Sequence, residues 1–409
     1  NSDLGTISIG NGSLAKIINL GSSIKLTAVT ITAGATFDIS SDTLTLTSTT
    51  TPLTTTGTFT TTGSTVVYTG NGPTIAATNY NNLEVSPATN SGTAVFAAGT
   101  FTIGGNLTIG NGTNTLVAVT AATNASILNV TGNFTISNNT TFTANTANAL
   151  SIGGNWSLGA TSAVFTANSG TVTFTATDTG NTLSGGMTGS SAFYNLIFNG
   201  SGGDWYLSSA HDLSVANLLT VTAGTFKGVS SDAYNLYARN GLVGNGIVDT
   251  STYGGSTVVD GSFGGDSNWI FSTLQTTTAN GGGVITATGS GSITVAGVFS
   301  MQSSSTFNAG SKTYILSRAF TSPFDPSGGT FNPDTSTFRF TGAGDITIAR
   351  PANGYYNLES KPASTNTHIL AGGGTLTIAN DFTVGSGSNA SIVDAETNDP
   401  VIDINRDFI

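Results

Sequence analysis

A spacing of apolar residues that recurs along the chain constrains its fold more than any other feature. In residues 152–158, apolar side chains stand at a first position and again at +4 and +6, with small or polar residues between them. These positions share one parity, so on an extended backbone they point to one face. The +2 position is mostly Gly or Asn, which suits a corner between two short strands. Copies of this corner motif, given by their first and +4 residues, are Ile103/Leu107, Val130/Phe134, Ile152/Trp156, Val215/Leu219, Val295/Phe299, Ile378/Phe382 and Ile404/Phe408.

One strand–corner–strand unit is too small to bury its apolar face alone, whereas stacked units can bury theirs together. Successive copies begin 27, 22, 63, 80, 83 and 26 residues apart. The short gaps suit one coil, and the long gaps suit about three or four coils whose other copies have drifted. The spacing therefore predicts an all-β chain folded as a parallel β-helix (β-solenoid), right-handed, forming one continuous rod without helical caps.

Composition weighs against two other folds. Apolar residues make up 37% of the 409 residues and charged residues only 8%, whereas disordered chains are poor in apolar residues and rich in charge. A series of β-sandwich domains also has short strands at regular spacing, but sandwiches repeat at longer lengths and need less Gly than the 54 present here. We therefore favour the solenoid.

Four segments are predicted along the chain. Residues 1–62 form N-terminal coils, and the Thr-rich run at 47–62 is interpreted as an outward strand face rather than a glycosylated stalk. Residues 63–169, 170–335 and 336–409 form three modules with one internal order: a strand, an aromatic-Asn-Leu block, a Gly-rich strand pair and a corner motif. Duplication of one block explains this order most simply.

Charge and Cys content exclude several functions. The net charge is −11, and without clustered Lys and Arg neither nucleic acid nor an anionic membrane surface is an expected partner. The absence of Cys excludes disulfides and thiolate metal sites, and no apolar run is long enough for membrane insertion. No cofactor is predicted. No secretory leader is recognisable, so we expect Asn1 to begin a mature or excised chain.

Catalytic constellations are weak. His211 and His368 lie in different modules, and no Gly-x-Ser-x-Gly elbow leads into a helix, although triad members can be distant in sequence. A glycosidase needs two carboxyls about 5–10 Å apart. Asp260 and Asp266 flank a Gly-rich loop, with Asp204 elsewhere, but any loop pair could meet that distance. We therefore expect that the chain is not an enzyme.

The acidic tail is the other candidate for chemistry. It comprises Asp394, Glu396, Asp399, Asp403 and Asp407, of which Asp399 and Asp403 are weak candidate Ca²⁺ ligands. Their spacing matches neither the EF-hand loop nor the Gly-rich nonapeptide. A solvated, charged coil or linker is the favoured interpretation.

Three asparagines share one corner position: Asn106, Asn133 and Asn155. Stacked corners would align them into a ladder with side-chain amides bonded along the axis. We favour that ladder over glycosylation of the Asn-x-Ser/Thr sequences that they form.

Both ends of the sequence lack a recognisable polar cap, and the last corner motif stops at Ile409, before its third apolar position. Open solenoid ends invite pairing with another copy. Either the chain is a piece of a longer repetitive protein, or subunits stack head to tail. The expected end contacts are Leu4, Ile7, Ile9, Ile404, Phe408 and Ile409.

The aromatic-Asn-Leu block, the Gly-Asn-Phe/Trp-Thr/Ser-Ile/Leu block and the strand at 170–175 resemble large repetitive bacterial surface proteins with adhesin-like β-solenoid repeats. The resemblance covers most of residues 63–409. It implies a cell-surface or secreted location and a structural, adhesive or filament role, and it supplies no catalytic residues.

The expected function is thus that of an extracellular structural protein, a subunit or segment of a bacterial surface filament whose partners are copies of itself. The alternative is an adhesin or a carbohydrate-binding or carbohydrate-cleaving β-helix protein that meets cell-surface glycans. Its groove would lie within residues 228–280, among Tyr234, Tyr237, Tyr253, Phe263, Trp269 and Phe271. The plainer interpretation of that segment is a coil with wider loops.

Overall fold

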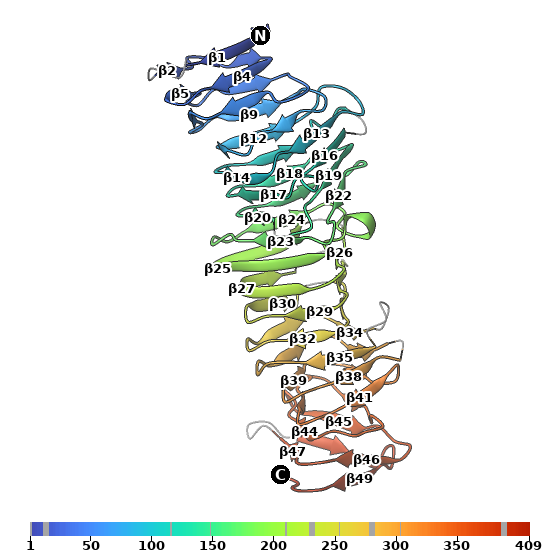
Figure 1. Ribbon diagram of the computed structural model, residues 1–409. Helices are drawn as coiled ribbons and strands as arrows, with labels where there is room; N and C mark the ends of the chain where they lie inside the picture. Colours follow the sequence, from blue (N-terminus) through green and yellow to red (C-terminus); the bar gives the residue numbers. More distant parts are fainter. Residues whose placement is uncertain are drawn as a thin grey trace. The chain divides into compact units, whose positions relative to one another are not determined.

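A computed structural model describes residues 2–10, 16–114, 117–147, 149–208, 211–228, 234–252, 254–277, 283–302, 304–385 and 391–409. The fold is all-β, with 51% strand and 1% helix. The chain divides into two compact units, residues 1–197 and 198–409, and each is a parallel β-solenoid (Figure 1). This confirms the predicted fold class. The right-handed winding, the single continuous rod and the four segment boundaries stay predictions.

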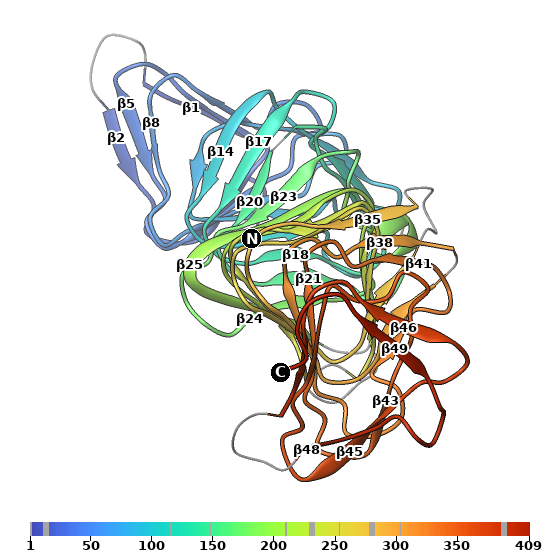
Figure 2. The ribbon, with the colours of Figure 1, turned by 90° about the horizontal axis from the view of Figure 1, so that it is seen from below.

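The first unit is built from parallel ladders, one for each wall of the coil. In Figure 2, β14, β17 and β20 follow one another along one wall. One ladder comprises β3 (Ile24–Leu26), β6 (Thr43–Leu46), β9 (Thr65–Tyr68), β12 (Asn82–Val85), β15 (Leu107–Ile109), β18 (Phe134–Ile136), β21 (Trp156–Leu158) and β24 (Asn181–Ser184). A second comprises β11 (Asn79–Tyr80), β14 (Gly99–Ile103), β17 (Ser126–Val130), β20 (Leu150–Ile152) and β23 (Thr171–Phe174). A third comprises β10 (Thr74–Ile75), β13 (Thr93–Phe96), β16 (Val117–Thr120), β19 (Thr140–Thr143) and β22 (Val164–Thr166).

Two shorter ladders hold the N-terminal coils of this unit. They comprise β1 (Thr6–Ile9), β4 (Ala28–Ile31) and β7 (Leu53–Thr55), and β2 (Lys16–Asn19), β5 (Ala35–Asp38) and β8 (Thr58–Thr60). Within the described residues, the only helical element is the short 3-10 turn η1 (Gly189–Ser191). Strand β25 (Asn195–Ser208) contains the point at which the two units divide.

The second unit has the same construction. One ladder comprises β30 (Ile247–Thr250), β33 (Trp269–Phe271), β36 (Ile293–Val295), β39 (Thr313–Leu316), β42 (Thr337–Phe340), β44 (Asn357–Ser360) and β47 (Phe382–Val384). A second comprises β29 (Gly241–Val243), β32 (Ser262–Gly264), β35 (Val284–Ala287), β38 (Thr306–Asn308) and β41 (Thr330–Asn332). The long β27 (Leu219–Lys227) pairs with β29 near its start and with β30 near its end.

The third wall of the second unit is interrupted. One ladder comprises β26 (Leu213–Val215), β28 (Leu236–Ala238), β31 (Thr257–Val259), β34 (Leu274–Thr276), β37 (Phe299–Met301) and β40 (Phe324–Asp325). It stops at β40, and a new ladder begins with β43 (Ile346–Ile348), β45 (Asn366–Leu370) and β48 (Ser391–Asp394). A last pair is β46 (Thr375–Ile378) with β49 (Val401–Ile404).

The core lies inside the coils. Apolar side chains alternate with Thr, Ser and Asn along the strands, as in β6, where Leu44 and Leu46 are buried and Thr43 and Thr45 lie outward. Side chains of a strand alternate between faces, so each wall sends every second residue inward. Parallel pairing then places inward residues of successive coils in columns along the stack.

Candidate functional site

The corner motif joins two walls of a coil. In its first copy, Ile103 ends β14 and Leu107 begins β15. The residues predicted to face the core are buried in six copies: Ile103, Leu107, Val130, Phe134, Ile152, Trp156, Val215, Leu219, Val295, Phe299, Ile378 and Phe382. Pairing also aligns the motif between coils, because Leu107 lies beside Phe134 and Phe134 beside Trp156. The motif therefore builds columns in the core.

Aromatic rings strengthen these columns. Phe134 and Trp156 are stacked, with ring centroids 5.1 Å apart and planes 28° apart. In the second unit, Tyr314 stacks on Phe338 at 4.7 Å. Such pairs add about 0.5–1.5 kcal/mol beyond the burial of their area. Successive coils are thus joined by side chains as well as by backbone hydrogen bonds.

The predicted asparagine ladder is present in the first unit, but its hydrogen bonds run from backbone N–H groups to side-chain oxygens instead of between side-chain amides. Asn133 N–H donates to Oδ1 of Asn106 at 2.8 Å, and Asn155 N–H donates to Oδ1 of Asn133 at 2.8 Å. The ladder extends to Asn82, which accepts from Asn106 N–H, and to Thr182, which donates to Asn155. Side chains here accept from backbone because the short Asn side chain reaches the corner N–H of the next coil. Amide-to-amide bonds of the predicted kind join Asn217 to Asn240 and Asn357 to Asn380.

Glycine at the +2 position leaves room for this ladder. A Cβ atom on Gly105, Gly132 or Gly154 would lie 2.3, 2.6 or 2.7 Å from the Asn Oδ1 of the coil before it. Real Cβ atoms do not approach an oxygen so closely. At Gly105 the asparagine oxygen is the one atom this close, whereas at Gly132 and Gly154 the carbonyl oxygens of Gly105 and Gly132 also lie at 2.7 and 2.9 Å, so the backbone of the preceding coil requires Gly there as well.

The predicted end-contact residues fall into two groups. Leu4, Phe408 and Ile409 are exposed at 67%, 68% and 62%. Ile9 is already buried in the first unit's core, and Ile7 and Ile404 are half-buried. Phe408 forms a parallel bridge with the buried Phe382, with ring centroids 5.4 Å apart. Contact with another copy stays a prediction.

The acidic tail is organised by turns. Asp394 Oδ1 accepts from the N–H groups of Glu396 and Thr397, and bonds from the Thr397 hydroxyl and these N–H groups hold the pKa of Asp394 below its usual value. Asp399 follows the turn at 396–398, and Asp403 lies on β49. No group of three or more His, Cys, Asp or Glu residues in the described parts of the chain is arranged to hold a metal ion.

Residues 228–280, where the alternative function would need a glycan groove, form solenoid coils in their described parts. Phe263, Trp269 and Phe271 are fully buried, and Trp269 Nε1 donates to the carbonyl of Gly246 at 2.9 Å. Tyr237 is half-buried beneath the Arg239 guanidinium, 4.6 Å from its ring centre. Tyr234 is half-buried, and Tyr253 lies outside the described residues. The plainer interpretation of this segment as coils agrees with these positions, and Phe263, Trp269 and Phe271 form no exposed groove, because their rings fill the core.

The carboxylates considered for catalysis do not form a surface pair. Asp260 is 1% exposed, while Asp266 is exposed and accepts from Ser290 N–H at 2.9 Å. Asp204 is buried and bonded at 2.7 Å to Lys227, whose pKa is raised by that hydrogen bond. These arrangements suit structural roles.

The two histidines also remain apart. His368 is fully buried, and its Nδ1 lies 2.8 Å from the hydroxyl of Ser360, which is buried as well. Burial lowers the pKa of His368, so the neutral ring is favoured. A substrate cannot reach this pair from solvent. His211 is half-exposed in the coil of β26.

A groove of about 920 Å³ opens on the second unit where the β40 ladder stops. Thr321 forms a bridge with Ile346 in the next coil, but β40 does not pair with that coil; Pro326 directly follows β40, Pro351 lies in the next coil, and both line the groove. Proline has no N–H to continue a ladder. The wall therefore opens beside β40 instead of pairing with the next coil.

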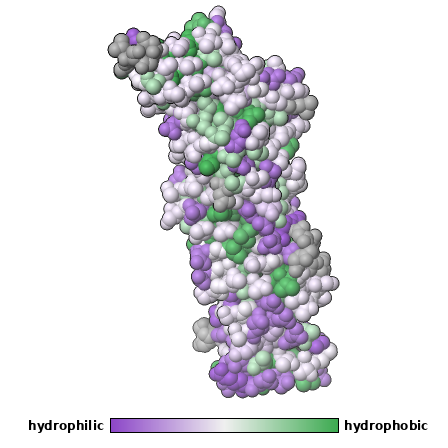
Figure 3. Space-filling model, viewed as in Figure 1, coloured by the Kyte–Doolittle hydropathy of each residue, from purple (hydrophilic) through white to green (hydrophobic). Residues whose placement is uncertain are grey.

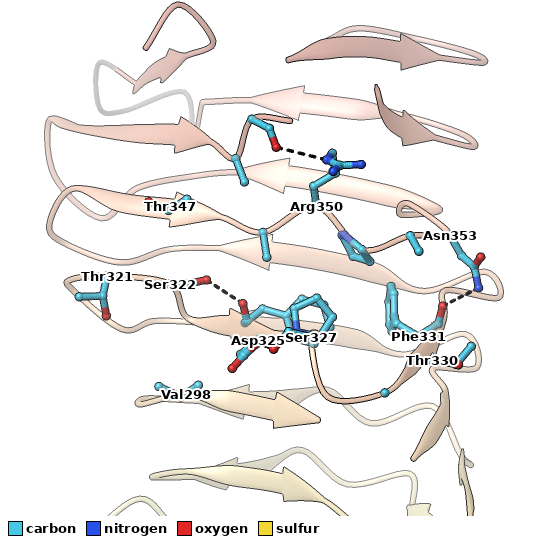
Figure 4. A pocket seen from close by; sticks show the side chains of 18 of the residues that line it. Val298, Thr321, Ser322, Asp325, Ser327, Thr330, Phe331, Thr347, Arg350 and Asn353 are labelled. Carbon is cyan, nitrogen blue, oxygen red and sulfur yellow. Dashed lines mark hydrogen bonds between the residues drawn. The ribbon is translucent and has the colours of Figure 1, made fainter. Parts of the chain in front are cut away.

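Charged and polar side chains surround the groove (Figure 4). Arg350 donates to the carbonyls of Gly372 and Gly373, at 3.4 and 3.1 Å. Asp325 Oδ1 accepts from the N–H and hydroxyl of Ser327, and Asn353 Nδ2 donates to the Phe331 carbonyl at 3.0 Å. Arg318 also lines the groove. The sequence did not predict this groove, because the position of the groove depends on the register between coils of unequal length.

No family model, no curated protein and no solved structure matches the chain. Among the described residues, no helix has the length and apolar character needed to cross a membrane.

Proposed function

We propose that this chain is a non-catalytic structural segment of an extracellular bacterial filament or stalk, built by stacking β-solenoid coils. The observation that carries the proposal is the repetition of side-chain columns within each unit. Phe134 pairs with Trp156, and the asparagine ladder repeats from coil to coil. The two faces of a coil thus match those of its neighbours, and such a stack can be extended by further coils.

Exposed apolar side chains support this extension. Phe408 continues the column of buried Phe382, and Ile18, 42% exposed, continues the column of buried Phe37. Burial of each would take a further coil of its own, one against β2 and one against Phe408, supplied either by the same polypeptide or by another copy. Removal of apolar area from water is the main favourable contribution to such association.

The surface agrees with an extracellular structural role. The face in Figure 3 is largely of intermediate hydropathy, with scattered polar and apolar residues. Thr108, Thr135 and Ser157 follow one another in an outward column of the first unit, and these small polar side chains cover that wall. The resemblance to repetitive bacterial surface proteins points the same way.

The test compares association of the wild-type chain with that of Phe408→Asp, by analytical ultracentrifugation over a concentration series and by electron microscopy. We expect the wild type to form end-to-end species as concentration rises, and Phe408→Asp to remain monomeric. Ile127→Asp is the matched control, because Ile127 is 40% exposed on β17 but faces outward. It should associate like the wild type.

A wild-type chain that stays monomeric at every concentration, together with a native polypeptide no longer than this sequence by intact mass, would contradict the proposal. A longer native polypeptide would instead assign the next coil to the same chain. Labelling of intact cells with an antibody tests the extracellular location, and an exclusively internal signal would refute it.

A further inference from the structure

We propose that the groove bounded by Arg318 and Arg350 binds an acidic polysaccharide, an extended polymer whose sugar units carry carboxylates. This inference does not rest on end-to-end stacking, because the groove opens beside β40 within the second unit. It follows from the charges, the length and the lining of the groove.

Two of the ten Lys and Arg residues of the chain, Arg318 and Arg350, line the groove. The nearby Arg339 and Lys361 pair with Glu359, and Lys312 is buried. Within the described residues, neither Arg318 nor Arg350 forms an ion pair with a carboxylate. A guanidinium presents paired N–H donors that match a carboxylate, so these two arginines are suited to an external anion.

The groove suits a polymer better than a small anion. Its lining comes from four successive coils, represented by Val298, Phe324, Thr347 and Ala371. Coils about 4.8 Å apart give a span of roughly 14 Å. A volume of about 920 Å³ is near the upper end of ordinary ligand pockets. Several linked sugar rings fit such a space.

The remaining lining favours sugars over peptides. Hydroxyl groups of Thr321, Ser327 and Thr347 line the groove, and the exposed Asp325 carboxylate can accept bonds from sugar hydroxyls. A peptide would bind such an open strand edge by adding a strand. That mode is blocked here, because β40 has only two residues and Pro326 follows it. A carboxylated sugar polymer therefore fits best.

The binding test uses the full chain and isothermal titration with a galacturonate hexamer. Neutral dextran and poly-L-glutamate serve as the uncharged and peptide comparisons. We expect the hexamer to bind, with an affinity that falls as salt is raised. Arg318→Gln and Arg350→Gln should each weaken binding at least about tenfold, the loss expected when a charged hydrogen-bond partner is removed.

Two further variants make the result decisive. Ala352→Glu adds a negative charge at an exposed groove residue without removing any hydrogen bond, so it should abolish binding while circular dichroism stays unchanged. Arg239→Gln removes an arginine from another coil and should bind like the wild type. The proposal is overturned if the hexamer does not bind, if Arg239→Gln weakens binding as much as Arg350→Gln does, or if dextran binds equally. Tighter binding of poly-L-glutamate would assign the groove to acidic peptides instead.

Discussion

At the scale of single residues, Lys312 shows how the coil interior accommodates a charge. It is 1% exposed, and its Nζ donates to the carbonyls of Gly265 at 2.7 Å and Gly291 at 2.9 Å, which belong to two earlier coils. Gly264 leaves the space for it, because a Cβ there would lie 2.5 Å from Lys312 Cε. No sequence pattern indicated this residue, since a single Lys just before a strand, here β39, is ordinarily an outward side chain.

Burial lowers the pKa of Lys312 to about 8, while the Asp266 carboxylate acts in the opposite direction. The unfolded chain would then hold this proton up to its ordinary value of 10.5, whereas the folded chain releases it near pH 8. Stability should therefore rise with pH above about 8 and fall as pH drops through that value.

Urea unfolding at several pH values between 7 and 9.5, below the titration of tyrosine in the unfolded chain, measures this dependence. Lys312→Met provides the control. Its stability should be lower, because two carbonyls lose their donor, and should vary less with pH over the same range. The same slope in both proteins would assign the pH dependence to other groups.

At the scale of elements, the sequence predicted which corner residues are buried and aligned, but not which hydrogen bonds join the corners. The 0, +4, +6 spacing correctly placed Ile103 and Leu107 in the core, and the shared corner position correctly aligned the asparagines. The bond itself was not foreseen, because it depends on which backbone N–H groups the wall ladders leave available at the turn. Asn82 was missed because it belongs to the aromatic-Asn-Leu block rather than to a corner motif.

The pairing of Gly105 with Asn82 predicts a non-additive effect. Gly105→Ala should cost about 1–3 kcal/mol of unfolding free energy, because its Cβ would lie 2.3 Å from Asn82 Oδ1. Asn82→Ala should cost about 0.5–1.5 kcal/mol, since Asn106 N–H loses its acceptor.

Because the second change removes the obstructing atom, the double variant should be more stable than the sum of the two losses by at least about 0.5 kcal/mol. Denaturant unfolding of the wild type and the three variants measures the four unfolding free energies that this double-mutant cycle compares. Strict additivity would show that the Gly is retained for another reason.

At the scale of the whole molecule, the β-solenoid class followed from periodicity, whereas the groove did not. The groove draws its lining from four successive coils, and their register is set by the lengths of the intervening loops. Drifted repeats hide those lengths. The buried rings of residues 228–280 illustrate the same limit, because Gly-rich loops obscured the alternation that places Trp269 and Phe271 inward.

Since each coil contacts mainly its neighbours, damage should stay local. Trp156→Ala removes a buried ring from the column of Phe134, at a cost of about 3–5 kcal/mol. Hydrogen exchange should then quicken in β18, β21 and β24, while β39 and β42 of the second unit keep their protection. Ile127→Ala, at an exposed residue, should change the hydrogen exchange of neither set of strands. Equal loss of protection in both units would reveal a single cooperative structure instead.

The unequal lengths of successive coils have a further consequence. Thr313 pairs with Thr337, 24 residues on, whereas Thr337 pairs with Asn357, only 20 residues on, and both pairs keep their strands in parallel register. Loops absorb the difference, so the walls keep a fixed pitch whatever the loops contain. Loop sequences in such a fold can therefore be exchanged, lengthened or recombined between coils during evolution. New binding surfaces can arise in the loops while the strand ladders that carry them stay unchanged.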